Sequence, residues 1–347
     1  MARDAIATAR AGGRALLRFP LMPHLPRSIT DAAIFLYPSE EEASKRAGWG
    51  GSGFLVGIPS EADPAKAHLC AVSNDHVTLQ APVIRVEKMD GSVEIIAGDP
   101  SDWVVHPDGD DIAVRPLGTA PVVIEQIRDQ RISVDAYCFF AANRLIRPED
   151  FNWGVGPSVG DECLMVGRYI NHDDEQFNRG VVRFGNLAMF PEPIRQHERA
   201  FDQESFLVDM RSVSGFSGSA VLVYYTEPGT LSMTMGEPRP WRTLLSEYWV
   251  LGVNWGHLPG RLQLREDGQD TRVLLDSSMA GVLPAWKVSE LLQEEQDVVK
   301  RRQQVEARLA HQPIGGAELD VEEPSDAPPD EGSIRRIVPK ADFNDGR

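Results

Sequence analysis

The chain has 347 residues, with 35 Lys and Arg against 52 Asp and Glu, so its formal net charge is −17. An acidic balance of this size disfavours a surface for nucleic acid or anionic lipid. No stretch approaches the roughly 18 apolar residues that a membrane-spanning helix needs. We therefore expect no nucleic-acid partner and no membrane partner.

The cysteine pattern bears on compartment and metal content. The three cysteines, Cys70, Cys138 and Cys163, form no C-x-x-C pair, which argues against a disulfide scaffold and against a structural zinc site. The segment His172-Asp173-Asp174 has acidic and histidine side chains, but its spacing fits no known ligand set. We expect no metal, no cofactor and a cytoplasmic location, because reduced thiols suit that compartment.

The two ends of the chain differ in composition from its middle. Residues 1–30 are rich in Arg and lack a signal-peptide core, and we predict a loosely held arm; a transit peptide stays open as an alternative. Residues 286–310 lack Gly and Pro and repeat apolar residues at helical spacing, which predicts one C-terminal helix. Residues 311–347 are acidic and proline-rich, which predicts a disordered tail. The helix or the tail is the candidate site for a regulatory protein partner, with plain surface packing and a solubilising role as the alternatives.

The central part, residues 31–285, consists of short apolar runs separated by Gly, Pro and Asp. Runs such as residues 54–56, 181–184 and 220–225 are rich in β-branched and aromatic residues and too short for helices. Many short strands with turn residues between them predict an all-β sandwich or barrel.

The strongest local signal for chemistry is the segment GFSGSA at residues 215–220, which continues into an apolar strand. Gly215 and Gly218 flank Ser217 on a tight turn. A nucleophilic serine needs such a bend, because its hydroxyl must be exposed and nearby N–H groups must converge on one oxygen. Taken alone, a Gly-Ser-Gly turn is more often only a turn.

Two further residues fit the same chemistry. His76 follows an apolar run, and Asp111 opens the β-rich run Ile112-Ala113-Val114. A serine cannot attack a carbonyl unaided, since it needs a base and an acid that fixes the tautomer of that base. The order His, Asp, Ser along an all-β chain therefore predicts a catalytic triad, with Asp110 as the alternative acid and His106 as a less favoured base.

These motifs resemble those of the trypsin-like peptidases of chymotrypsin fold, in particular the compact bacterial, DegP-like branch. The matching segments are GSGFLV at residues 51–56, SNDHV at 73–77, DIAV at 111–114, VGD at 159–161, GFSGSA at 215–220 and GVNWG at 252–256. The resemblance implies two antiparallel six-stranded β-barrels, at about residues 31–125 and 126–285. No PDZ domain is expected, since only a helix and a tail follow.

The resemblance also implies a serine endopeptidase with a peptide or protein substrate. Ser217 would attack the scissile carbonyl, His76 would act as general base and acid, and Asp111 would orient the imidazole. The N–H groups of Gly215 and Ser217 would form the oxyanion hole. Three residues of the following strand, Asn254, Trp255 and Gly256, would lie beside the extended substrate.

Specificity and activity leave alternatives open. Arg211 lies six residues before Ser217, near the expected base of the S1 pocket, which would favour an acidic P1 side chain; alternatively it pairs with Asp209 or faces solvent. The rival function is a trypsin-like fold that is catalytically latent and acts as a protein-binding module, because a triad can be held in an inactive geometry.

Overall fold

The computed structural model describes residues 25, 27–48, 50–122, 137–151, 156–168, 180–196, 201–211, 215–224, 248–266 and 269–311. The chain divides into two units, residues 1–311 and residues 312–347. The predicted acidic tail, most of the N-terminal arm and the segment His172–Asp174 lie outside the described residues. Every helix and strand of the described residues belongs to the first unit.

The first half of this unit is built on an eight-stranded sheet with the strand order β5-β4-β1-β2-β3-β7-β6, and β8 pairs with β2 beside this path. Neighbouring strands along the path are antiparallel, and the β2–β8 pair is parallel. Its elements are α1 (Arg27–Asp31), β1 (Ala33–Tyr37), α2 (Glu40–Lys45), β2 (Ser52–Pro59), β3 (Lys66–Ser73), α3 (Asp75–Thr78), β4 (Val83–Glu87), β5 (Val93–Ile96), β6 (Val104–Val105), β7 (Ala113–Pro121) and β8 (Phe140–Ala141).

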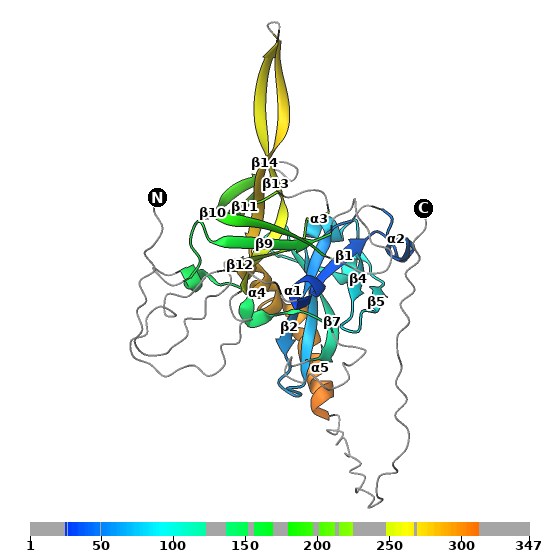
Figure 1. Cartoon of the computed structure of the whole chain (residues 1–347). Coiled ribbons are helices and arrows are strands. Elements are labelled where there is room, and N and C mark those ends of the chain that lie inside the picture. Colours follow the sequence, from blue (N-terminus) through cyan, green and yellow to red (C-terminus); the bar gives the residue numbers. More distant parts are fainter. Residues whose placement is uncertain are drawn as a thin grey trace, which may run out of the picture. The chain divides into compact units, whose positions relative to one another are not determined.

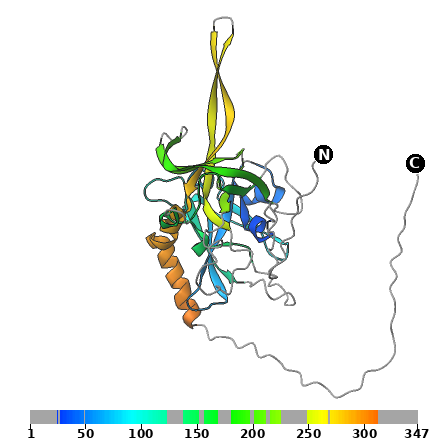
Figure 2. The same cartoon turned by 60° about the vertical axis from the view of Figure 1, so that its left-hand side comes forward.

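The second half is a closed barrel with the strand order β10-β11-β14-β13-β12-β9. Its strands are β9 (Glu162–Gly167), β10 (Val181–Gln196), β11 (Phe201–Asp209), β12 (Ala220–Tyr224), β13 (Tyr248–Glu266) and β14 (Gln269–Pro284). Strands β13 and β14 stay paired far beyond the barrel and form the two-stranded ribbon that extends from it in both views (Figures 1 and 2).

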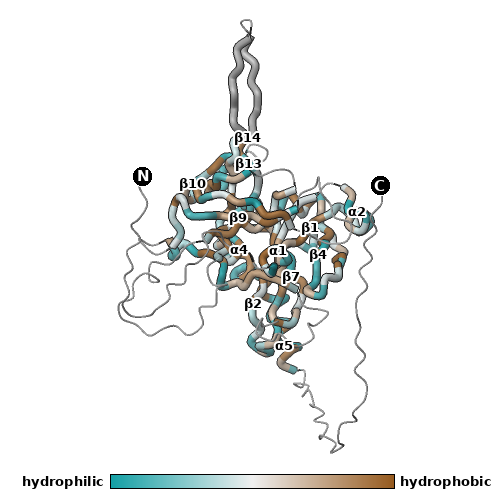
Figure 3. Tube along the Cα trace, viewed as in Figure 1, coloured by the Kyte–Doolittle hydropathy of each residue, from teal (hydrophilic) through white to brown (hydrophobic). Residues whose placement is uncertain are grey.

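The predicted all-β architecture of two halves is confirmed, but the first half is not the predicted six-stranded antiparallel barrel, since its described residues have eight strands and one parallel pair. The second half closes with six strands, whereas the first half remains an open half-barrel in the described residues. Short runs of β-branched and aliphatic residues form these strands, as expected from their preference for a pleated, half-buried surface. Figure 3 shows apolar stretches along strands of both halves.

One apolar core joins the two halves. Side chains of the first sheet, among them Phe54 and Val72, belong to the same buried cluster as Phe216 and Val253 of the barrel. A second cluster around Ile34 and Leu36 and a third around Phe35 and Tyr37 lie within the first half. Because a continuous core spans both halves, residues at their boundary are held at fixed positions.

The C-terminal region contains two helices, α4 (Ala285–Gln293) and α5 (Gln296–His311), where the sequence predicted one. Helix α4 buries four apolar side chains, Ala285, Val288, Leu291 and Leu292, but α5 buries only Val298. At the interruption, Arg302 Nη1 of α5 donates a hydrogen bond of 2.8 Å to the Leu292 carbonyl near the end of α4. Among the described residues, no helix is long and apolar enough to span a membrane.

Candidate active site

The predicted base and acid lie together in the first half. His76 is in α3, directly after β3, and Asp111 lies just before β7. The Asp111 carboxylate accepts two hydrogen bonds from His76, one from its backbone N–H (3.0 Å) and one from Nδ1 (2.7 Å). Because a carboxylate only accepts, Nδ1 carries the proton and Nε2 is left as the ring nitrogen that can take one.

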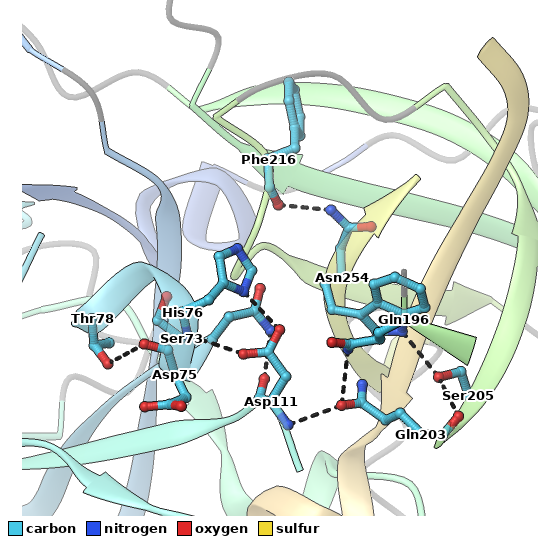
Figure 4. A network of polar contacts seen from close by, with 12 residues as sticks. Ser73, Asp75, His76, Thr78, Asp111, Gln196, Gln203, Ser205, Phe216 and Asn254 are labelled. Carbon is cyan, nitrogen blue, oxygen red and sulfur yellow. Dashed lines mark hydrogen bonds and ion pairs between the residues drawn. The ribbon is translucent and has the colours of Figure 1, made fainter. Parts of the chain in front are cut away.

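The environment of the two side chains differs. The Asp111 side chain is 2% exposed and that of His76 is 33% exposed. The Asp111 backbone is fixed as well, since its carbonyl accepts from Asn74 Nδ2 at 2.8 Å and its N–H donates to Gln203 Oε1 at 2.9 Å. Figure 4 shows this network around His76 and Asp111. The buried carboxylate thus orients a histidine whose side chain is partly exposed.

The alternative acid and base are engaged elsewhere. One oxygen of Asp110 lies 3.3 Å from His106 Nδ1 and 3.3 Å from Lys287 Nζ, and His106 Nε2 lies 3.0 Å from Glu290 Oε2. Burial alone would lower the pKa of Lys287, but the carboxylates of Asp110 and Glu290 outweigh it and raise that pKa. Asp110 and His106 thus connect the first half to α4, while Asp111 is the residue bonded to His76.

The loop that carries Ser217 is shaped by its glycines. Gly215 and Gly218 have φ angles of 97° and 88°, in the region that side chains disfavour. Two backbone hydrogen bonds fix the loop: the Ser217 carbonyl accepts from Ser52 N–H at 2.8 Å, and Gly218 N–H donates to the Asn254 carbonyl at 2.8 Å. The Ser217 residue itself is half-buried.

Close packing brings this loop against the element that carries His76. A Cβ added at Gly51 would lie 2.9 Å from the Ser217 carbonyl oxygen and 2.6 Å from a methyl of Val77, the neighbour of His76. A Cβ added at Gly218 would lie 2.3 Å from Ser73 Oγ. In the described part of the chain no hydrogen bond joins His76 to Ser217; such bonds are often long in unliganded enzymes and tighten with substrate.

The predicted oxyanion donors are available. Within the described residues, the N–H groups of Gly215 and Ser217 donate to no protein acceptor. The Gly215 carbonyl is occupied, because it accepts from Ser52 Oγ at 2.6 Å. Residues 212–214, which precede this loop, lie outside the described part.

The predicted substrate-side residues lie at the barrel end of β13. Asn254 is fully buried and its Nδ2 donates to the Phe216 carbonyl at 2.9 Å, so it supports the serine loop. A Cβ added at Gly256 would meet nothing within 4 Å, which shows open space beside this strand. Trp255 is half-buried, and Arg211, directly after β11, is exposed. The role of Arg211 in specificity stays a prediction.

Two supporting residues were not recognised from the sequence. Ser52 lies in a glycine-rich motif, but the motif does not show that its hydroxyl joins the serine loop to Arg168 N–H, at 2.7 Å. Gln203 lies on an ordinary strand with no local signature. Both act through tertiary contacts, which a single sequence does not display.

The two buried thiols differ from a nucleophilic cysteine. Burial raises the pKa values of the Cys70 and Cys163 thiols to about 12 each, so neither is a thiolate at neutral pH. Among the described residues there is no group of three or more His, Cys, Asp and Glu that could hold a metal ion.

No protein-family model matches the chain, and no curated protein matches it. Among solved structures, it is similar to the protease domain of MamO from Magnetospirillum magneticum in its apo form, with a TM-score of 0.42 and 12% identity over 77% of this chain and 98% of that one. It is also similar to the HtrA-type protease AlgW with a tripeptide (TM-score 0.38, 15% identity, 77% of this chain, 62% of that one).

A third similar structure is the Rv3671c protease in its inactive form, with a TM-score of 0.37 and 12% identity over 77% of this chain and 89% of that one.

The strand topology of this chain is a separate observation that identifies its fold. An open first half carries His76 and Asp111, a closed six-stranded barrel carries Ser217, and the backbone of the Ser217 loop packs against Gly51 beside Val77, the neighbour of His76. The chain therefore has the chymotrypsin-like protease fold, which confirms the resemblance to the trypsin-like peptidases.

Proposed function

We propose that this protein is a serine endopeptidase that hydrolyses peptide bonds through Ser217, His76 and Asp111. The observation that carries the proposal is the two-point hydrogen bond between His76 and the buried Asp111, packed against a serine loop with two unpaired N–H groups. The protease fold supports the class of reaction, and the side chains at its centre support the serine mechanism.

The proposal gives each group a role. Ser217 Oγ attacks the scissile carbonyl while His76 Nε2 accepts its proton, and the same proton passes to the leaving amine. Asp111 keeps the imidazole in the tautomer with Nδ1 protonated and stabilises the imidazolium. The N–H groups of Gly215 and Ser217 bind the developing oxyanion; losing one such donor typically costs about 2.7–4 kcal/mol of transition-state stabilisation.

The pairing of β12 with β13 ends at Val253, whereas β14 stays paired with β13 beyond it, which supports an extended substrate on the other side of β13. A peptide there would pair with β13 and add a strand to the barrel. Arg211 as a specificity residue would favour an acidic P1 side chain. Cleavage of a peptide library only after apolar or small residues would contradict that assignment.

Labelling with a fluorophosphonate probe, followed by peptide mass spectrometry, tests the proposal. We expect stoichiometric label on Ser217 in the wild type and none in Ser217→Ala or His76→Ala. Ser219→Ala is the matched control, because the Ser219 hydroxyl is buried and makes no hydrogen bond in the described residues, so labelling should persist. A folded wild type that takes no label would contradict the proposal and favour the latent binding module.

A further inference from the structure

A hydrogen bond crosses from the second half of the molecule to the candidate acid in the first. Gln203, on β11, is fully buried and accepts the Asp111 backbone N–H with its Oε1 at 2.9 Å. The same oxygen accepts Nε2 of Gln196, on β10, at 3.0 Å. Gln203 thus contacts Asp111, the residue that orients His76. It lies far from Asp111 in the sequence and outside the motif at residues 111–114.

The orientation of the Gln203 amide follows from its partner. A backbone N–H can only donate, so the group that faces Asp111 must be the acceptor Oε1. Asp111 is 1% exposed, so water cannot readily replace this acceptor. A side chain at position 203 without an acceptor would leave a buried N–H unpaired beside the acid.

The same strand also contacts the expected substrate strand. Ser205 Oγ donates to the Gln203 carbonyl at 3.1 Å and accepts the indole N–H of Trp255 at 2.9 Å. The indole lies against Gly281 of β14, where an added Cβ would be 2.3 Å from its ring. Figure 4 shows the chain of contacts among Asp111, Gln203 and Ser205.

We infer that Gln203 is a positioning residue for the acid, and that Gln203 and Ser205 together couple Asp111 to the substrate strand at Trp255. The inference rests on the proposed function and adds a link between substrate binding and the orientation of the base in the same site. When a peptide pairs along β13, it restrains Trp255, and the contacts through Ser205 and Gln203 restrain the Asp111 backbone. Substrate binding and orientation of the base are thereby linked through β11.

The first test separates kcat from KM in purified, folded variants. Gln203→Met keeps the length of the side chain but removes the acceptor, and we expect kcat to fall about tenfold to a hundredfold with KM within about twofold. Gln196→Met is the matched control, because Gln196 is buried and bonds the same oxygen of Gln203 as a separate donor, on β10. It should leave kcat near the wild-type value.

Rescue separates positioning from simple packing. Gln203→Glu keeps an oxygen at the accepting position and should recover part of the kcat that Gln203→Met loses. Ser205→Ala should lower kcat/KM for peptides long enough to reach Trp255 while leaving the fluorophosphonate labelling rate unchanged, because the probe does not occupy that strand. In the double variant Gln203→Met with Ser205→Ala, the loss in kcat/KM should be smaller than the product of the single losses.

The outcomes distinguish this inference from the proposed function. A wild type that is not labelled would contradict the proposed function itself. An active wild type with an unchanged kcat in Gln203→Met, or an equal fall in Gln196→Met, would overturn the inference alone. If Gln203→Met does not fold, Ser205→Ala decides, and an unchanged kcat/KM on long peptides overturns the coupling.

Discussion

The two sides of the candidate site are held in place by different means. On the base side, hydrogen bonds involving the side chains of His76, Asn74, Gln203 and Asp111 itself fix Asp111. On the nucleophile side, backbone conformation dominates: two glycines with positive φ and backbone hydrogen bonds from neighbouring strands shape the loop around Ser217. On the base side, substitution of a side chain should therefore mainly lower kcat. On the nucleophile side, a substitution that strains the backbone should mainly disrupt the loop.

The largest effect is expected from Asp111→Asn. An amide in place of the carboxylate can hold the imidazole in the wrong tautomer, and in a Ser-His-Asp triad this exchange lowers kcat about 10⁴-fold. The change nearly preserves volume, so thermal unfolding should differ little. Steady-state hydrolysis of a peptide substrate measures the effect.

Asp110→Asn is the matched control for this prediction. Asp110 lies next to Asp111 in the chain but contacts His106 and Lys287, so its exchange should leave kcat within a few-fold of the wild type. An equal loss of kcat in both variants would show that Asp111 has no special role on the base side.

On the nucleophile side, Gly218→Ala should disrupt the loop. The backbone at φ 88° disfavours a side chain, and the added Cβ would lie 1.9 Å from the Ser52 carbonyl oxygen. Strain of this kind costs about 1–3 kcal/mol for the backbone alone, and the overlap adds to it. We expect a lower free energy of unfolding together with loss of fluorophosphonate labelling.

Gly256→Ala provides the contrast, because its added Cβ would meet nothing within 4 Å. Its free energy of unfolding should equal that of the wild type, while KM for peptides should rise, since the methyl group occupies the space beside the substrate strand. A drop in stability as large as that of Gly218→Ala would show that the nucleophile side is not specially constrained.

Ser52→Ala tests a buried side chain that supports the nucleophile side. Ser52 is fully buried; its hydroxyl donates to the Gly215 carbonyl and accepts Arg168 N–H. Its removal leaves both groups without that partner, which costs about 1–3 kcal/mol for a buried polar group. Urea unfolding should show this loss, whereas Ser219→Ala, equally buried but unpaired in the described residues, should show little change.

The sequence and the structure agree where the signal is local. His76, Asp111 and Ser217 stand in short motifs whose residue types follow from the chemistry, and the glycines beside Ser217 follow from the turn. Gln203 has no such signature, because a single glutamine on a strand gains its role only from the residue it meets in the other half. The break between α4 and α5 is similar: residues 294 and 295 are both Glu, a good helix former, and a contact from Arg302 accompanies the end of α4.

The openness of the first half also depends on contacts between residues distant in the sequence. The strand runs predict β-structure, but closure depends on whether the edge strands β5 and β6 meet, and both are short. Alternation within a strand says nothing about that pairing. The strands were thus predictable from local sequence, whereas their long-range pairing was not.

The smallest effect concerns α5, which lies away from the site. The Glu306 carboxylate accepts from Ser60 Oγ (3.1 Å) and from the backbone N–H groups of Glu61 (3.1 Å) and Ala62 (2.9 Å), and it bonds His68 Nε2. Partial burial alone would raise its pKa, but these hydrogen bonds, led by that of His68, lower it to about 2. A lowered pKa in the folded state means that the ionised carboxylate stabilises the fold above the ordinary pKa of a glutamate.

This contribution is lost as the pH falls from the ordinary carboxylate range towards about 2. Glu306→Gln should therefore be less stable than the wild type at neutral pH, and the difference should shrink as the pH falls. Thermal unfolding of both proteins between neutral and acidic pH measures it. His68 lies on β3 five residues before Ser73, roughly 16 Å along the strand, so kcat of the variant should stay unchanged. A fall in kcat without a fall in stability would show that the base side is also held from α5, and that the contacts at Asp111 are not sufficient to fix it.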